Sequence, residues 1–438
     1  MDVSLEPVSA RYDRPGKAIE ALRQQVMGAM ASIIDPRIEQ PAELMGHLPN
    51  YTAYRAFIKG LEMFWRSDFS GSRQHFQRAI ELDPYYQLPR ILLILSYHNV
   101  GEWAESGPLR AELERRRGEL SPYESYRLDQ LIASAAGDLQ AAYHAARQAS
   151  SISPEFGPVF DGAMYAIVLN HPKEGIDALQ TIDMRGVLIG WTLYWEYLTL
   201  ARHMLGDHDE ELHDALLARA QYPDSVGVMF AEIRARAALG DINGVEKLID
   251  ASTRLGIRSD WTQGGLLRQT GLELIAHGQA DAGRKALARA ISWYETLPSP
   301  EKETRRHSLA LSLLWAGRVD EAIVLLEMIN QEDPEQFLVL GALGVARALK
   351  GDRADAERIV THLEAMNISF SFGGPSAWQA QIAASLGNKD QAIVFLQRAF
   401  SEGRFQDDWI HTRPVFQTLR DYPPFQALLQ PQEDPKNR

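Results

Sequence analysis

Histidines and carboxylates crowd one short stretch of the sequence, between residues 203 and 214, where they could bind a metal ion. Imidazole and carboxylate groups are ligand types that suit zinc. However, His208 and His213 are five residues apart and would point away from each other on one helix, whereas paired metal ligands favour spacings of three or four. Acids also gather at helix N-termini because of the helix dipole, so an exposed polar turn is favoured and we assign no metal. The stretch consists of His203, Asp207, His208, Asp209, Glu210, His213 and Asp214.

Other catalytic signatures are missing from the sequence. It has no cysteine, which excludes thiol catalysis, disulfides and cysteine-based zinc sites. It also lacks the motifs of phosphate loops, dinucleotide-binding turns, zinc proteases and serine hydrolases. We therefore expect a protein that is not an enzyme and has no cofactor. A metal-dependent hydrolase centred on His203, His208 and His213 is kept as a remote alternative.

Four aromatic residues lie close together between residues 191 and 197. At helical spacing Trp191, Tyr194 and Trp195 share a face, while Tyr197 points elsewhere, so much of this helix is aromatic. Packing between repeats is the favoured interpretation. A recognition surface is the alternative, because Trp and Tyr are enriched in binding hot spots.

The composition limits the kinds of partner that the chain can have. A formal net charge of −13 disfavours nucleic acid, because proteins that bind it cluster Lys and Arg against the phosphates. The basic run from Arg115 to Arg117 has Glu112 and Glu114 beside it, which indicates a solvated helix end. No apolar run is long enough to span a membrane, and the N-terminus does not resemble a secretory signal. We therefore expect a cytoplasmic protein.

A recurring Gly-Asp pair reveals the elements that must position these side chains. It begins at Gly137, Gly206, Gly240 and Gly351, with separations of 69, 34 and 111 residues, close to multiples of about 35. Glycine can take the left-handed conformation that ends a helix, and the aspartate can cap the next helix. Each pair therefore predicts a sharp turn between two helices, and the chain is predicted to be one continuous array of helical hairpins.

The first clear hairpin spans residues 53–84 and carries small, aromatic and proline residues at defined positions. Gly60 and Ala79 allow close helix approach, Phe69 and Phe76 fill the groove between helices, and Pro84 stops the second helix. With these residues the sequence resembles the tetratricopeptide repeat (TPR) family. The resemblance implies an all-α, right-handed superhelical solenoid of about ten helix-turn-helix repeats.

Continuing in the same register gives three segments: an N-terminal helix and connector at 1–50, a repeat solenoid at 51–400, and a C-terminal capping segment at 401–438. The fourth repeat turns at Asn170-His171-Pro172 without a Gly-Asp pair, so we expect the superhelix to deviate there. Spacings of 38 and 39 residues between Gly240, Gly278 and Gly317 predict longer helices or an extended loop at 297–300.

A second resemblance is narrower. The N-terminal helix, the first repeats, the stretch SPYESYRLDQLIASAAGDL and the C-terminal segment are similar to the repeat half of bacterial signalling proteins. In those proteins a cyclase, Ser/Thr kinase or DNA-binding output domain precedes the repeats. This sequence contains no such domain, so the resemblance implies no catalytic activity here.

The TPR resemblance also implies which residues contact a ligand, because the first helices of such repeats line a concave groove. Three of them, Arg127, Arg234 and Arg268, could each hold a carboxylate through the guanidinium fork. The Lys/Asn pattern of members that clamp a chain-terminal carboxylate is missing, which disfavours a chaperone-tail ligand. The groove candidates are Tyr54, Phe57, Trp65, His98, Asn99, Arg127, Asp161, Tyr165, Glu196, His203, Phe230, Arg234, Arg268 and His307.

Two main functional hypotheses follow. The leading one is a non-catalytic scaffold that binds a peptide or partner protein in the concave groove. The alternative is a regulatory sensor that binds a small ligand and controls a separately encoded signalling output, since solenoids can flex between repeats.

Overall fold

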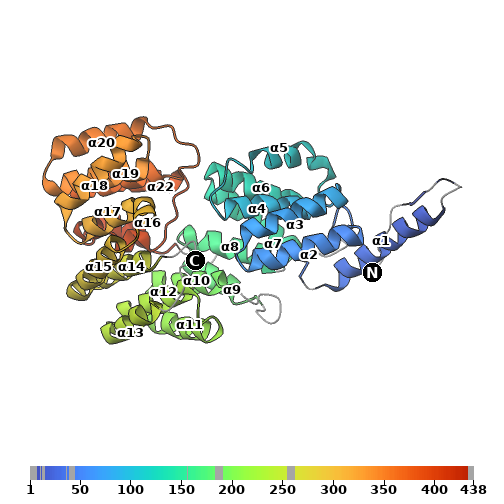
Figure 1. Ribbon diagram of the computed structural model, residues 1–438, viewed down its shortest axis with the longest axis horizontal. Coiled ribbons are helices and arrows are strands. Elements are labelled where there is room, and N and C mark those ends of the chain that lie inside the picture. Colours follow the sequence, from blue (N-terminus) through green and yellow to red (C-terminus); the bar gives the residue numbers. More distant parts are fainter. Residues whose placement is uncertain are drawn as a thin grey trace. The chain divides into compact units, whose positions relative to one another are not determined.

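The computed structural model describes residues 7–9, 11, 15–35, 37–38, 45–154, 156–182, 191–253 and 262–432. Every regular element within these ranges is a helix, and many of the helices pack as pairs that are adjacent in the sequence (Figure 1). The predicted all-α class of paired helices is confirmed. None of the described helices combines the length and the hydropathy that a bilayer crossing requires.

The chain divides into two compact units, where the sequence predicted one continuous array. One unit is Met1–Ala166 with Asp177–Trp191, and the other is Ile167–Ile176 with Thr192–Arg438. The division falls within the fourth repeat, at the turn that lacks a Gly-Asp pair. Asn170 adopts a φ of 65° there, in the left-handed region that asparagine tolerates better than most residues.

The first unit contains the N-terminal helix and the first repeats. Its helices are α1 (Pro15–Ile34), α2 (Tyr51–Trp65), α3 (Phe69–Leu82), α4 (Leu88–His98), α5 (Gly107–Arg115), the 3-10 helix η2 (Arg117–Glu119), α6 (Pro122–Ala136) and α7 (Leu139–Ile152), with most of α8 (Phe156–Val168) and the end of α9 (Pro172–Leu179).

The second unit contains the remaining repeats and the C-terminal segment. Its first helices, meaning the first member of each pair, contact one another in sequence and form one layer; they are α10 (Leu193–Leu205), α12 (Val226–Ala238), α14 (Gln263–Ala276), α17 (Arg306–Trp315), α19 (Phe337–Lys350) and α21 (Gly374–Ser385). The second helices are α11 (His208–Gln221), α13 (Ile242–Ser252), α15 (Ala280–Glu295), α18 (Val319–Glu332), α20 (Arg353–Ala365) and α22 (Lys389–Ser401). Short helices complete the unit: α16 (Ser299–Thr304), α23 (Trp409–Thr412), η3 (Pro414–Leu419) and α24 (Pro423–Leu429).

The Gly-Asp pairs form the predicted turns, but only some of their aspartates cap a helix. All four glycines have a positive φ, between 76° and 92°. Asp138 accepts a hydrogen bond from Ala141 N, and Asp241 from Gly244 N, both at 2.9 Å. Asp207 and Asp352 make no such side-chain cap, which corrects the expectation that all of these acids are caps. Asp352 instead accepts a hydrogen bond from Arg347 Nη1 at 2.9 Å.

The seventh and eighth repeats are longer than the others because they contain additional helical residues, one of the two explanations that the glycine spacing predicted. α15 has 16 residues, and the short helix α16 is inserted before α17. Residues 297–300 therefore lead into a helix instead of forming an extended loop. Pro298 precedes this helix and Pro300 lies in its first turn, where proline is tolerated because the amide there has no partner within the helix.

The N-terminal helix α1 carries a stripe of apolar residues at helical spacing, and this stripe is exposed. Ile19 is 69% exposed and Met30 is 55% exposed, while Gly28, Ala29 and Ser32 are buried. The small residues of α1 pack against the chain just before α2, where a Cβ on Gly28 would lie 1.9 Å from Pro49 O.

Gly60 confirms that small residues set the distance between paired helices. A Cβ at this position would lie 2.6 Å from Cε1 of Phe76, a ring that is fully buried in the first unit. At Gly162, also within a helix of this unit, the nearest atom to a new Cβ would be Arg147 Cγ at 3.9 Å, which is an ordinary contact.

We therefore predict opposite effects for two helical Gly→Ala substitutions in the same unit. Gly60→Ala overpacks the α2–α3 contact and should lower the free energy of unfolding by about 1–3 kcal/mol. Gly162→Ala should leave it unchanged or raise it by up to about 1 kcal/mol, because alanine favours helix more than glycine. Urea unfolding followed by circular dichroism measures both, and equal effects would contradict the packing described here.

Candidate functional site

The C-terminal segment, residues 403–432, lies across the layer of first helices in the second unit. Its elements α23 and η3 contact α14, and η3 also contacts α21. Trp409, Ile410, Phe416 and Leu419 are buried in this packing. The sequence predicted that this segment covers the end of the array, whereas much of it covers the first-helix layer.

Backbone hydrogen bonds hold this segment at both ends. Gln406 N donates to Val168 O at 2.9 Å, and Gln432 N donates to Asn170 O at 2.7 Å. Nδ2 of Asn170 also donates to Gln430 O at 2.9 Å. The segment therefore runs from the last repeat back to the turn after α8.

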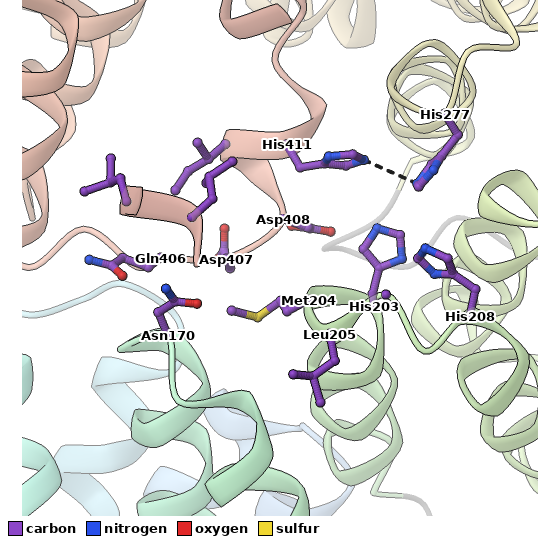
Figure 2. Close-up of a pocket in the computed structure, with 14 residues that line it drawn as sticks. Asn170, His203, Met204, Leu205, His208, His277, Gln406, Asp407, Asp408 and His411 are labelled. Atoms are coloured by element: carbon purple, nitrogen blue, oxygen red, sulfur yellow. Dashed lines mark hydrogen bonds between the residues drawn. The ribbon is translucent and has the colours of Figure 1, made fainter. Parts of the chain in front are cut away.

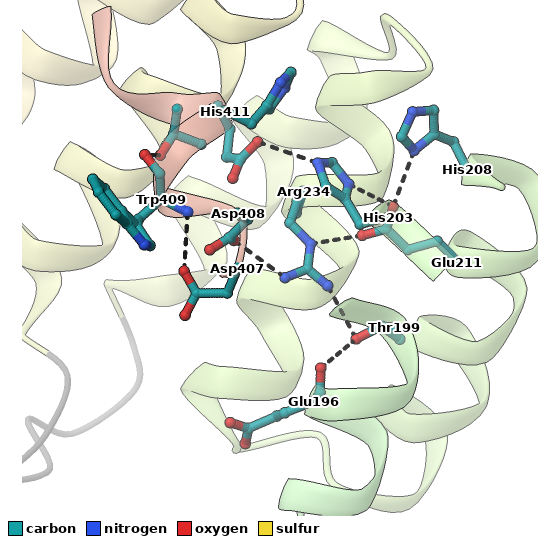
Figure 3. Close-up of polar contacts among 12 residues, drawn as sticks. Glu196, Thr199, His203, His208, Glu211, Arg234, Asp407, Asp408, Trp409 and His411 are labelled. Carbon is teal, nitrogen blue, oxygen red and sulfur yellow. Dashed lines mark hydrogen bonds and ion pairs between the residues drawn. The ribbon is translucent and has the colours of Figure 1, made fainter. Parts of the chain in front are cut away.

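Arg234 of α12 is the centre of a buried polar network beneath this segment (Figure 3). Its Nε donates to Glu211 Oε1 at 2.7 Å, and its Nη2 donates to Thr199 Oγ1 at 3.2 Å. Its Nη1 lies 3.5 Å from Oδ2 of Asp408 in the C-terminal segment. One guanidinium thus joins α10, α11, α12 and the segment that covers them.

Glu211 is the fully buried anion of this network. Its Oε2 lies 2.8 Å from His203 Nδ1 and 3.2 Å from His208 Nδ1. Burial alone would raise the pKa of Glu211, but Arg234 and His203 outweigh this effect and hold the pKa well below its usual range. The carboxylate therefore stays ionised and orients both imidazoles.

A cavity of about 370 Å³ opens beside the network, and four imidazoles border it (Figure 2). They belong to His203, His208, His277 and His411, which come from three separate regions of the sequence. Burial and the neighbouring His411 lower the pKa of His277 to about 3, and burial and His203 lower that of His411 to about 4. Both rings are therefore neutral at pH 7 and able to donate a lone pair.

Several guanidinium groups gather near the same segment. Among the described residues, neither Arg268 Nε nor Arg404 Nε has a hydrogen-bond partner, although both atoms are buried. Burial and the nearby Arg268 lower the pKa of Arg413 to about 10. His307 also has a lowered pKa, because of burial and Arg268. Positive charge is therefore concentrated at this place, with Asp407 as a nearby carboxylate.

In the first unit, the predicted groove residues mostly bond to one another. Arg127 Nη1 lies 2.5 Å from Asp161 Oδ2, and Gln130 Nε2 donates to the same oxygen at 2.8 Å. Tyr165 hydrogen-bonds Ser134. Arg127, Asp161 and Tyr165 are all buried, so the structure joins α6 and α8 through them.

The remaining candidates from the first unit are distributed over its core and surface. Tyr54, Phe57 and Trp65 are buried in the hydrophobic core, and the Tyr54 hydroxyl donates to Asp35. His98 is buried, with Nε2 3.0 Å from Ser106 Oγ, while Asn99 is exposed at the end of α4.

In the second unit the structure brings Glu196, His203 and Arg234 onto neighbouring first helices. Glu196 accepts a hydrogen bond from Thr192 at 2.7 Å, and Phe230 is buried in the core of α12 to α15. Two of the four residues in the aromatic run at 191–197 are buried: Trp191, at the end of the first unit, is 5% exposed and packs edge-on against Phe156 and Phe160, and Tyr194 is also buried. Trp195 and Tyr197 are partly exposed.

Sequence reasoning found only part of this site. It paired His203 and His208 with His213, which is exposed on α11, and missed His277 and His411. It also missed Glu273 of α14 and Asp408. The position of the histidines in the repeats could have indicated the cluster. His203 and His277 each lie near the C-terminal end of a first helix, just before its turn glycine, and these helix ends are neighbours in a stack of repeats.

Comparison with known proteins gives matches in structure only. No family model and no curated protein matches the sequence. One structural neighbour is a tetratricopeptide repeat protein from Parabacteroides merdae, with 13% identity and a TM-score of 0.32, covering 64% of this chain and 93% of that one. The human IFIT1 dimer with m7Gppp-AAAA has 14% identity and a TM-score of 0.37, covering 91% and 84%. The Cut9-Hcn1 hetero-tetramer has 11% identity and a TM-score of 0.28, covering 80% and 87%.

The described part of the chain is an array of paired helices, the architecture that the tetratricopeptide resemblance implied. Its paired helices, left-handed turn glycines and small residues at helix contacts establish this architecture. The resemblance to signalling proteins and the expected absence of a nucleic-acid partner both stay predictions.

We predict that Arg234→Ala strongly destabilises the second unit, by about 3–5 kcal/mol, because it leaves the buried Glu211 carboxylate without its cation. The matched control is Arg284→Ala, which removes an exposed ion pair with Asp281 and should cost at most about 1 kcal/mol. Urea unfolding monitored by tryptophan fluorescence compares the two. A loss below about 1 kcal/mol for Arg234→Ala would show that the network does not hold the unit together.

Proposed function

We propose that this chain is a non-catalytic interaction scaffold whose second unit binds an extended peptide or a partner protein on its first-helix layer. The observation that carries the proposal is that this layer already holds a short piece of the same chain, which consists of a turn followed by the short helix α23. Residues 403–413, GRFQDDWIHTR, are held by a backbone hydrogen bond to Val168 O and by the Arg234–Asp408 ion pair.

The contacts of this piece define the chemistry that a partner needs. It offers a carboxylate to Arg234 and an indole ring to an apolar site, with Trp409 only 6% exposed. A buried aromatic anchor beside a charge-assisted contact is typical of hot spots in protein interfaces. A partner segment that carries an acid followed by an aromatic residue would therefore take the same place.

Competition within the chain provides a direct test. In the wild-type chain the tethered segment has a high effective concentration and blocks the site. Trp409→Ala removes its apolar anchor and leaves Arg234 in place, so a labelled peptide of residues 403–413 should bind this variant at least about tenfold more tightly than the wild type. Fluorescence anisotropy measures the binding.

Two controls make the result specific. Phe370→Ala removes an exposed aromatic side chain of the same unit and should bind the peptide no better than the wild type does. A peptide in which Asp408 is changed to Ala should bind Trp409→Ala less well. Equal binding of both peptides, or no binding by the variant, would overturn the proposed site.

A second candidate function is sensing of a small anionic ligand, favoured by the cluster of Arg268, Arg404 and Arg413. Guanidinium groups with open donors are suited to phosphate or carboxylate groups. The test uses the chelator-treated chain with pyrophosphate or citrate added separately. Each anion should raise the unfolding temperature of the wild type and raise that of Arg413→Gln less. Equal shifts in both proteins would exclude this cluster as the site.

A further inference from the structure

Four imidazole rings border the cavity of the second unit (Figure 2), and the buried carboxylate of Glu273 lies within ligand distance of three of them. Ring centroids lie 4.8 Å apart for His277 and His411, 5.3 Å for His203 and His277, and 5.8 Å for His203 and His411. Glu273 of α14 approaches the same rings. These side chains come from α10, α11, the C-terminal end of α14 and α23, so the fold assembles them from distant parts of the sequence.

The donor atoms have the spacing of ligands around one small cation. Nε2 of His277 and Nε2 of His411 are 3.3 Å apart. Zinc–nitrogen bonds of about 2.0–2.1 Å in a tetrahedron place two ligand atoms about 3.3–3.4 Å apart. Oε2 of Glu273 lies 3.7 Å from His277 Nε2 and 3.9 Å from His203 Nε2, and all four donor atoms lie within 4.8 Å of one another.

The Glu273 carboxylate supplies an independent indication of a ligand. Glu273 is 1% exposed, and among the described residues its Oε2 has no hydrogen-bond partner. A buried carboxylate oxygen without a partner is costly, and such groups are usually satisfied by a hydrogen bond or an ion. This oxygen is part of the same cluster as the three imidazoles.

The surroundings of His203 match those of a metal ligand. Its Nδ1 is 2.8 Å from Glu211 Oε2, so Nδ1–H donates to the carboxylate and Nε2 keeps its lone pair toward the cluster. Arg234 fixes Glu211 in turn, through the 2.7 Å hydrogen bond from its Nε (Figure 3). Metal-binding histidines are commonly oriented by a carboxylate in this manner.

We propose that three histidines and one glutamate of the second unit bind a single zinc ion that ties the C-terminal segment to the repeats. Nitrogen and oxygen ligands in a tetrahedral set suit zinc, and four protein ligands fill its coordination, which is typical of a structural site. The site does not depend on the peptide-binding proposal. Its ligands are His203 Nε2, Glu273 Oε2, His277 Nε2 and His411 Nε2.

The first experiment measures zinc on the whole, untagged chain after chelator treatment. Titration calorimetry with zinc chloride, followed by dialysis and elemental analysis, should give one tightly held zinc per chain. Zinc should also raise the unfolding temperature, because it binds the folded state. A chain that retains no zinc and shows no shift would overturn the proposal.

Variants then locate the site. His411→Ala and His277→Ala each remove a ligand and should weaken zinc binding by more than about a hundredfold, since loss of an orienting neighbour alone costs about 10–100-fold. His213→Ala is the matched control, because this histidine is exposed on α11 and should have no effect. Equal effects of His213→Ala and His411→Ala would contradict the assignment.

Cobalt substitution tests the ligand set on the wild-type chain, so it does not require that the histidine variants fold. Co²⁺ added to the wild-type chain should give the strong visible absorption of tetrahedral coordination. The weak absorption of an octahedral, water-rich complex would overturn the proposed ligand set. His208→Ala should leave the tetrahedral spectrum intact, whereas its loss would assign the ion to the neighbouring group of His203, His208 and Glu211.

Discussion

The buried ion pair between Arg234 and Glu211 is the interaction on which the rest of the second unit depends. A carboxylate that is fully buried needs a cation and hydrogen bonds, because desolvation would otherwise favour its neutral form. Arg234 supplies both and extends a second contact to Asp408. The same pair fixes the ring of His203, so charge compensation, the position of the C-terminal segment and the histidine cluster are linked.

Local signals in the sequence predicted the repeats well. Glycines such as Gly137 and Gly240 take the left-handed conformation that the Gly-Asp pattern implied, and Gly60 packs against Phe76 as a small residue should. These features depend on residues within one hairpin or at one turn. The cap role of the following acid was less predictable, because Asp352 bonds Arg347 instead.

The candidate site was predicted poorly because it depends on contacts between segments far apart in the sequence. Arg234 and His203 were identified by register, but Asp408 lies 174 residues beyond Arg234, and His411 lies 134 residues beyond His277. No periodicity relates a C-terminal segment to the repeats that it covers. The pattern for zinc was sought between neighbours in the sequence, at His208 and His213, whereas the fold gathers its imidazoles across repeats.

The central claim is that residues 403–432 lie on the first-helix layer through the contacts described. Hydrogen exchange of backbone amides, measured by mass spectrometry on the whole chain, tests it most directly. The amides of Gln406 and Gln432 donate to Val168 O and Asn170 O, so their exchange should be at least about a hundredfold slower than in a free peptide, and Asp408→Ala should accelerate it over residues 403–413. Exchange at the rate of an unstructured peptide in the wild-type chain would contradict the account.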